Sequence, residues 1–166
     1  MKRVILSFFC LLMAHAAFAA DDIGGFWKTV NEEGKAQCII AVYEYQGLYY
    51  GRIIGTFDDA GKMDDSIYKP SKRAPGVVGD PFYSGLDIIW DLRDSGSKFK
   101  GKILDPEHGD VYASELWIDG INLIVRGKLF IFGRSQEWLP ASKADFPKGF
   151  KMPNLKALIP SIPVVK

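Results

Sequence analysis

The chain has 166 residues, of which 48% are hydrophobic and 25% are charged, and its formal net charge is +1. These values describe an ordinary globular protein and exclude a disordered chain, a collagen-like fibre and a membrane protein with several spans. The nearly neutral charge also argues against nucleic acid as a partner, because no excess of basic residues is available to meet a phosphate backbone.

The first 19 residues have the pattern of a secretory signal peptide. A cationic start precedes an apolar stretch over residues 4–14, and Ala17-Phe18-Ala19 places small residues at the positions that a signal peptidase reads. The apolar core of about 11 residues is too short for a membrane span, which needs about 20. We expect cleavage between Ala19 and Ala20, a periplasmic or secreted protein, and no transmembrane span in the mature chain.

Cleavage would leave one cysteine, Cys38, and one histidine, His108. A lone cysteine makes no internal disulfide, and its apolar neighbours predict a small buried residue rather than a reactive thiol. A lone histidine cannot build a two-histidine metal site, and the sequence Asp105-Pro106-Glu107-His108-Gly109 is typical of a turn. We therefore expect no metal and no cofactor.

The periodicity of the remaining chain is that of β-strands. Short runs rich in Val, Ile, Tyr, Phe and Trp alternate with Gly, Asp, Asn and Ser, which predicts an all-β protein. The expected strands lie near residues 25–30, 38–45, 48–56, 87–93, 98–104, 111–118, 121–128 and 134–139. Asp119-Gly120 is the strongest hairpin signal. Eight strands joined mostly by tight turns predict an antiparallel meander that closes into a barrel, with a sandwich as the alternative.

Residues 57–86 interrupt this meander with a long connection rich in Gly, Pro and Asp. A connection of this length is typical of a functional lid, an Ω-loop or disorder. Four carboxylates within it match no calcium-loop spacing and predict a solvated acidic turn. They are Asp58, Asp59, Asp64 and Asp65.

The C-terminal segment over 140–166 holds five of the nine prolines and several apolar residues. Prolines exclude a central strand or a long regular helix, so we expect an extended strap packed on the barrel or a segment that meets a partner. The expected organisation is a signal peptide over 1–19, a β-barrel over 20–139 and this Pro-rich segment.

Gly25-Phe26-Trp27 resembles the Gly-x-Trp sequence that begins the first strand of lipocalin-like barrels. In those barrels the indole plugs the closed end and an arginine from a late strand lies across it, a cation–π contact of roughly 0.5–2 kcal/mol. The resemblance implies that Trp27 is the plug and that Arg126 or Arg134 is its partner.

Six motifs in order resemble the bacterial family called domain of unknown function 2147, small exported proteins with no established activity. They are Gly25-Phe26-Trp27-Lys28-Thr29, Tyr50-Gly51-Arg52-Ile53, Gly101-Lys102-Ile103-Leu104-Asp105-Pro106, Gly109-Asp110-Val111-Tyr112, Val125-Arg126-Gly127 and Gly133-Arg134-Ser135-Gln136-Glu137-Trp138. The resemblance spans about residues 24–139 and implies a lipocalin-like antiparallel barrel in the envelope. It supplies no catalytic residue, and relatives often carry Asn in place of His108 and a cysteine pair that this chain lacks.

These observations predict a non-enzymatic envelope protein that holds a small apolar ligand inside its barrel, because a barrel of about eight strands can enclose one small ligand. The candidate lining residues are Tyr43, Tyr45, Tyr50, Trp90, Tyr112 and Trp117.

Two alternatives remain open. One is an interaction or scaffold module with a solid core, in which residues 57–86 or the C-terminal segment meet an envelope protein or a membrane surface. The other is an enzyme based on carboxylates and tyrosines, whose groups would converge in one concave site. Its constellation would be Asp105, Glu107, His108, Tyr112 and Arg126.

Overall fold

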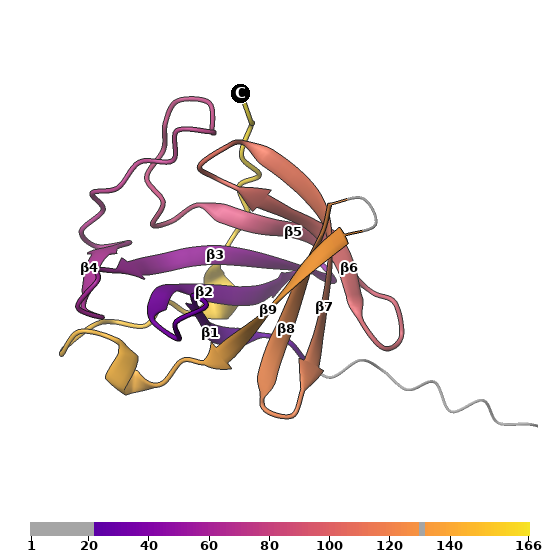
Figure 1. Ribbon diagram of the computed structural model, residues 1–166, viewed down its shortest axis with the longest axis horizontal. Coiled ribbons are helices and arrows are strands. Elements are labelled where there is room, and N and C mark those ends of the chain that lie inside the picture. The colour runs from indigo at the N-terminus through magenta and orange to yellow at the C-terminus, as the bar shows by residue number, and fades with distance from the viewer. Residues whose placement is uncertain (1–21, 130–131) are drawn as a thin grey trace, which may run out of the picture.

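The computed structural model describes the backbone of residues 22–129 and 132–166. It describes their side chains except those of residues 128–134. The predicted signal peptide therefore lies outside the described residues. Nine antiparallel strands form one sheet (Figure 1). They are β1 (Gly25–Val30), β2 (Ala36–Tyr45), β3 (Leu48–Phe57), β4 (Met63–Ser66), β5 (Asp87–Asp94), β6 (Phe99–Asp105), β7 (Asp110–Asp119), β8 (Asn122–Leu129) and β9 (Phe132–Pro140). Two short 3-10 helices follow, η1 (Lys143–Asp145) and η2 (Leu155–Ala157).

The sheet closes on itself, as the meander predicts. Its strand order is β2-β1-β9-β8-β7-β6-β5-β3-β4, and an additional β2–β3 pairing joins the two sides. Eight strands therefore form a closed barrel, and β4 is an extra strand on the outside edge of β3. The eight expected strands are confirmed, with ends within two residues of those predicted. Sequence analysis missed β4 because its four residues, Met63-Asp64-Asp65-Ser66, contain no apolar alternation.

The barrel closes at a short seam between β1 and β9. Only two residue pairs form it, Trp27 with Pro140 and Lys28 with Leu139. The Ala141 backbone N–H extends the seam by donating to the Phe26 carbonyl at 2.8 Å, and the Lys28 ammonium makes an ion pair with Asp145 in η1. The part of β9 near Phe132 consequently extends past the end of β1.

Tight turns connect the strands at one end of the barrel. Gln46 and Gly47 have φ values of 52° and 79°, which is the two-residue pattern of a type I′ hairpin. The predicted β7–β8 hairpin is confirmed, but its central residues are Gly120 and Ile121, because Asp119 pairs with Asn122. Gly120 has a φ of 61°, as the first central residue of a type II′ turn requires.

The two ends of the barrel differ. At the end that carries the tight turns, residues 22–24 precede β1, and Ile23 is fully buried there. The Trp27 indole N–H donates to the Ile23 carbonyl at 2.9 Å. We call this the closed end. The other, open end carries the connections over 31–35, 58–86 and 106–109.

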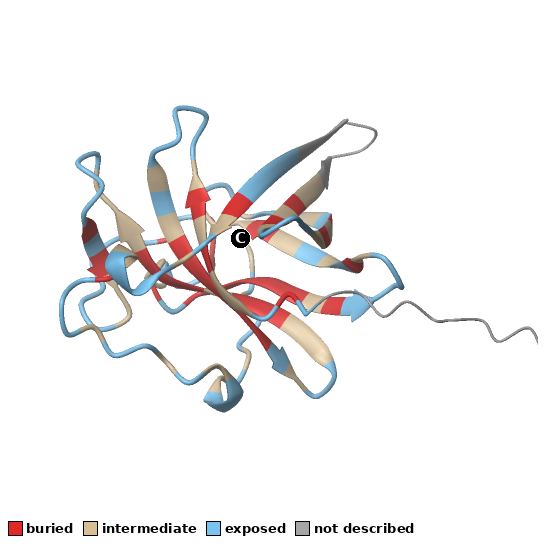
Figure 2. Ribbon diagram, turned by 90° about the horizontal axis from the view of Figure 1, so that it is seen from below, coloured by how far each residue is buried: buried red, intermediate tan, exposed pale blue. Residues whose placement is uncertain are grey.

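The chain after Pro140 runs along the outside of the barrel. Phe146 packs on Ile39, Ala41 and Ile54, which are the outward residues of β2 and β3. Near the C-terminus, Val165 forms a bridge with Val77 of the long connection. The red bands of buried residues in Figure 2 therefore lie on both the inner and the covered outer faces of the strands.

The long connection is held against the β6–β7 turn at the open end. The Gly76 N–H donates to the Pro106 carbonyl at 3.1 Å. A Cβ atom on Gly76 would lie 2.1 Å from the Gly109 nitrogen, so the two backbones cross in contact. Gly109 itself has a φ of 80°, which favours glycine and agrees with its predicted role in a turn.

Trp27→Ala should lower the free energy of unfolding by about 3–5 kcal/mol, because it removes a buried aromatic side chain that supports both the closed end and the seam. Urea unfolding followed by circular dichroism measures the change. Trp117→Ala is the matched control, since Trp117 lies on the outer surface and should cost much less. An unchanged unfolding midpoint for Trp27→Ala would contradict the role of Trp27 as a plug.

Candidate functional site

The inner face of the barrel changes character along its axis. Toward the closed end, large apolar side chains point inward and are buried, among them Trp27, Leu116, Leu123 and Trp138. Toward the open end the inward positions become smaller or polar. They are Thr29, Cys38, Tyr112, Ser114 and Gly127, as the strand register defines them. Apolar walls with a few polar groups are typical of small-ligand sites.

Ser114 and Gly127 face each other across β7 and β8. Ser114 is 2% exposed, and its hydroxyl has no hydrogen-bond partner in the part of the chain that the structure describes. A buried polar group without a partner costs about 1–3 kcal/mol. A Cβ atom built on Gly127 would meet only the Ile103 side chain, at an ordinary 3.7 Å. Among the described side chains, Ile103 alone lies near this position; Arg134, which pairs with Gly127 from β9, has its side chain outside the described residues.

Gln136 marks where this inner wall meets solvent. It pairs with Val125, which points inward and is 2% exposed, yet Gln136 is exposed. Its amide oxygen accepts a hydrogen bond from the buried Trp138 indole at 3.0 Å. Because β9 extends past β1 at this level, Gln136 is exposed at the edge of β9 while its inward neighbour Val125 stays buried.

Three of the predicted lining aromatics come together, but outside the barrel. Tyr43 and Tyr50 are paired and stacked with ring centroids 5.8 Å apart, and Tyr45 meets Tyr50 edge-on at 6.4 Å. The register puts Tyr43 on the opposite face to Val42, which lines the interior beside Ile40.

The other three predicted aromatics point in different directions. Trp90 is buried but pairs with Lys102 on the outward side, and Trp117 faces outward with the Lys98 ammonium 4.0 Å from its ring. Tyr112 pairs with Ile103 on the inner face. The six aromatics therefore do not line one cavity. Strand alternation groups the aromatics by face but does not say which face points inward, and in β5 a bulge after Trp90 also interrupts the alternation.

Sequence analysis missed a buried polar network beside Tyr43. The Asp87 side chain is fully buried, and Arg52 donates to its two oxygens at 3.1 and 2.6 Å. The Tyr43 hydroxyl donates to the same carboxylate at 2.8 Å. Burial, and then the Asp87 charge, raise the pKa of Tyr43 well above its usual range. The only sequence signal was Arg52 within the Tyr50-Gly51-Arg52-Ile53 motif.

This network holds the C-terminal segment. The Ser161 N–H donates to Asp87 at 2.7 Å, and Arg52 donates to the Ile159 carbonyl at 2.7 Å. Both partners in the segment are backbone groups, so their contacts do not depend on the side chains at these positions. The arrangement is an anchor for the segment.

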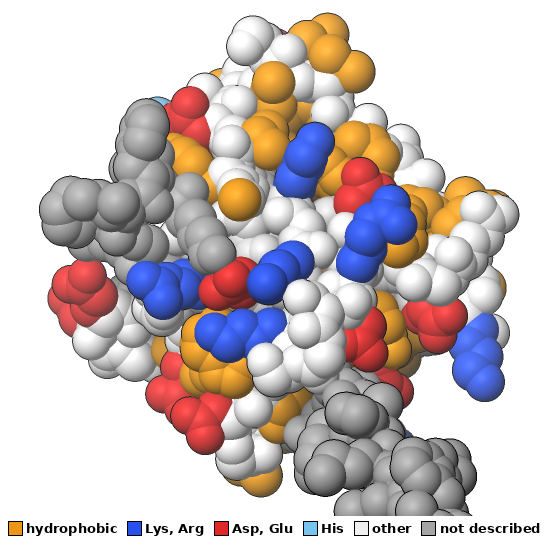
Figure 3. Space-filling model, turned by 90° about the vertical axis from the view of Figure 1, so that its right-hand side faces the viewer, with side chains coloured by type: hydrophobic (Ala, Val, Ile, Leu, Met, Phe, Trp, Pro, Cys, Tyr) orange, Lys and Arg blue, Asp and Glu red, His pale blue; other side chains and the backbone are white. Residues whose placement is uncertain are grey.

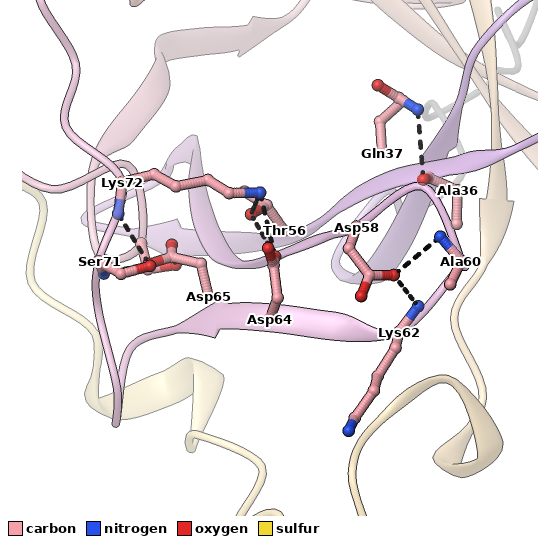
Figure 4. A network of polar contacts seen from close by, with 11 residues as sticks. Ala36, Gln37, Thr56, Asp58, Ala60, Lys62, Asp64, Asp65, Ser71 and Lys72 are labelled. Atoms are coloured by element: carbon pink, nitrogen blue, oxygen red, sulfur yellow. Dashed lines mark hydrogen bonds and ion pairs between the residues drawn. The ribbon is translucent and has the colours of Figure 1, made fainter.

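The predicted solvated acidic turn is partly wrong (Figure 4). Asp58 behaves as expected and accepts from the N–H groups of Ala60 and Lys62 at 3.0 and 2.8 Å. Asp65, however, is 1% exposed and accepts from Ser71, Lys72 and Ser84. Burial would raise the pKa of Asp65, but these donors outweigh it and hold the pKa below its usual range. Asp65 therefore organises the loop.

The residues of the enzyme alternative do not converge. His108 is exposed and lies 2.9 Å from Asp105 within its own turn. Tyr112 points inward, whereas Arg126 pairs with Glu115 on the outer face. Among the described residues no group of His, Cys, Asp and Glu could hold a metal ion.

Cys38 is a half-buried thiol that packs against the core. Its sulfur lies 3.2 Å from the Thr29 hydroxyl, and burial raises its pKa to about 11. The thiol therefore stays protonated and unreactive at neutral pH.

The predicted arginine over Trp27 is not Arg126, which faces the outer side of β8 while Trp27 faces inward. Arg134 pairs with Gly127 through its backbone, and its side chain lies outside the described residues. That part of the prediction remains untested.

Comparison with known proteins agrees with this fold. Residues 25–139 match the family described as "Uncharacterized protein conserved in bacteria (DUF2147)". Protein HP1028 from Helicobacter pylori, described as belonging to the lipocalin family, is 15% identical and has a TM-score of 0.58. The similarity covers 75% of this chain and 86% of that one. Comparison with curated proteins gives no match. None of the described helices is long and apolar enough to cross a membrane.

Asp87→Ala should release the C-terminal segment and lower the free energy of unfolding by about 3–5 kcal/mol, because it leaves the half-buried Arg52 without its partner. The hydrogen-exchange rate of the Ser161 amide should increase by much more than global destabilisation alone would cause. Tyr43→Phe is the control, since it keeps the ion pair and should cost about 1 kcal/mol. Unchanged protection of Ser161 would refute the anchor.

Proposed function

The chain belongs to the DUF2147 family, and on that premise we propose that it is a non-enzymatic binding protein with a small ligand at the open end of its barrel. The lipocalin-like fold is compatible with this function. The observation that carries the proposal is the inner wall at Ser114 and Gly127, where a buried hydroxyl without a partner lies beside a position with no side chain.

The wall defines the chemistry of the ligand. Ser114 and Tyr112 offer hydroxyls and Gln136 an amide, whereas Ile103 and Val125 supply apolar contact on the same face. A ligand that fits both the polar groups and the apolar side chains is largely apolar. It has one polar end that donates a hydrogen bond to a hydroxyl or accepts one from it. Such a ligand would recover the cost of the unpaired Ser114 hydroxyl, about 1–3 kcal/mol.

Two surface hollows lie elsewhere and support this proposal less well. One, of about 430 Å³, is at the closed end, lined by residues that include Asp22, Glu44 and Tyr49. The other, of about 640 Å³, is lined by Arg73, Pro75, Gly79, Asp80 and Lys166 on the outer surface. Both are open and contain charged side chains, so they do not suit an apolar ligand.

We propose further that the protein acts outside the cytoplasm, because residues 1–19 have the pattern of a signal peptide. The intact mass of the protein recovered from a bacterial periplasm tests this directly. A mass equal to that of a chain that begins at Ala20 supports export. The mass of the full-length chain, found in the cytoplasm, contradicts it.

Native mass spectrometry of the protein purified from a bacterial host should show a stoichiometric adduct that organic extraction removes. Gly127→Leu should abolish the adduct, because the new side chain fills the inner wall beside Ser114; the position has no strained φ, so folding should persist. Ala113→Leu is the matched control, since Ala113 lies on the outer face of β7 and should keep the adduct. An adduct lost equally in both variants would contradict the site.

The apo protein offers a second measurement. The fluorescent apolar probe anilinonaphthalene sulfonate should bind extracted wild-type protein and the Ala113→Leu variant, and bind Gly127→Leu at least about tenfold more weakly, which corresponds to the 1.4 kcal/mol that separates tenfold affinities. Equal binding by all three proteins would place the probe elsewhere and count against the proposal.

A further inference from the structure

The outer face of β6, β7 and β8 is covered by the rest of the described chain only toward the open end. The C-terminal segment packs on β2 and β3, and the long connection lies against the β6–β7 turn. Among the outward residues of β6, Leu104 near that turn is 3% exposed, whereas Lys100 and Lys102 are exposed. The exposed part of this face is turned toward the viewer in Figure 3, where blue side chains lie across the middle with red and orange side chains among them.

Cations dominate the centre of this face. Lys98, Lys100 and Lys102 alternate along one edge of β6, Arg93 pairs with Lys100, and Arg126 lies on β8. Lys100, Lys102 and Arg93 are exposed. No ion pair to a described carboxylate is formed by these three residues or by Arg126, whose Nε also lacks a hydrogen-bond partner.

The carboxylates on the same face are fewer and are engaged. Glu115 lies 3.6 Å from the Lys98 ammonium, and Glu137 accepts a hydrogen bond from Asn122 at 2.5 Å. Asp119 lies at the end of β7, beside the hairpin tip. Among the described side chains of β6–β8 and Arg93, five cations thus outnumber these three carboxylates.

The side chains between the cations are apolar. Trp117 carries the Lys98 ammonium 4.0 Å from its ring, and Ile124 pairs with it across β7 and β8. Val111 on the same face is 39% exposed, and Ile121 at the hairpin tip is 77% exposed. Cations beside a tryptophan and exposed aliphatic side chains suit the boundary between lipid headgroups and acyl chains.

The geometry distinguishes a surface from a linear polymer. Lysines two residues apart on a strand are separated by about 6.6–6.8 Å. Strands β6 and β8, which have β7 between them, are about 9.6 Å apart. The cations of β6 and β8 thus spread in two dimensions rather than along one line. We infer that the exposed outer face of β6–β8, with Arg93 of β5 at its edge, docks on a membrane surface rich in anionic phospholipid.

Vesicle sedimentation tests this inference on the protein purified from the compartment in which it accumulates. Vesicles of phosphatidylcholine with about 30 mol% phosphatidylglycerol should bind the protein, and pure phosphatidylcholine should bind it far less, because each cation near an anionic surface adds attraction. Sodium chloride at about 0.5 M should weaken the binding strongly. Equal binding to both vesicles would overturn the inference.

The double substitution Lys100→Glu and Lys102→Glu should lower the partition coefficient at least about tenfold. The control is Lys69→Glu with Lys148→Glu, two exposed lysines in segments at the far side of the barrel (Figure 1), which changes the net charge equally. The control should bind within about twofold of wild type. An equal loss in both double variants would show an effect of net charge alone and would overturn the docking face.

Soluble anionic polymers provide the remaining comparison. Heparin and single-stranded DNA should bind more weakly than the vesicles and should not discriminate between the two double variants as strongly. Tighter binding of either polymer, with the same dependence on Lys100 and Lys102, would assign the face to a polymer and overturn the lipid partner. All variants replace exposed side chains, so unchanged thermal unfolding midpoints should accompany each result.

Discussion

The seam between β1 and β9 is the contact on which the barrel depends. Only two residue pairs join the strands, so the barrel closes there through backbone contacts that would be marginal alone. The buried Trp27 indole on one side and the Lys28–Asp145 ion pair on the other hold β1 in place. Without this closure the inward residues of all eight strands would lose their opposite wall.

The short seam also explains where the barrel is accessible. Because β1 ends at Val30, no described strand pairs with the portion of β9 around Gln136 on that side, and an inward residue is exposed there. Edge strands invite pairing with other chains unless their side chains discourage it. Here Ser135, Gln136 and Glu137 are polar or charged, which protects the edge while it leaves the inner wall within reach of solvent.

The C-terminal segment divides the outside of the barrel into two halves. It leaves the closed end after Pro140, covers the apolar outer face of β2 and β3, is held by Arg52 and Asp87, and reaches Val77 at the open end. On the opposite side, Lys100 and Lys102 of β6 are exposed. A single strand can therefore serve two roles: β7 presents Ser114 to the interior and Trp117 to the outer face.

Much of the fold could be predicted from the sequence, because strands leave a period of two and turns need glycine. The predicted hairpin at Asp119-Gly120 is in the correct place, but its centre is shifted by one residue. Gly120 is the first of the two central residues of the turn, and Ile121 is the second. The sides of the aromatic residues could not be predicted, because a period of two does not say which face of a strand points inward. In β5 a bulge with Asp91 at a φ of 55° also interrupts the period beside Trp90.

The candidate site was less accessible to sequence analysis for a different reason. Ser114 carries no local motif, and its significance comes from Gly127, a partner thirteen residues away that only the β7–β8 register brings opposite. The Asp87 anchor likewise needs contacts between residues 52, 87 and 161. Long-range pairings of this kind are properties of the closed barrel rather than of any segment.

Amide chemical shifts of the isotopically labelled protein before and after organic extraction test the account most directly. If the ligand lies at the open end, the shifts that change should centre on Tyr112, Ser114, Gly127 and Gln136, while amides of the closed end around Ile23 and Leu123 stay fixed. Changes confined to the closed end, or spread over the outer face at Lys100 and Lys102, would contradict a ligand site inside the barrel.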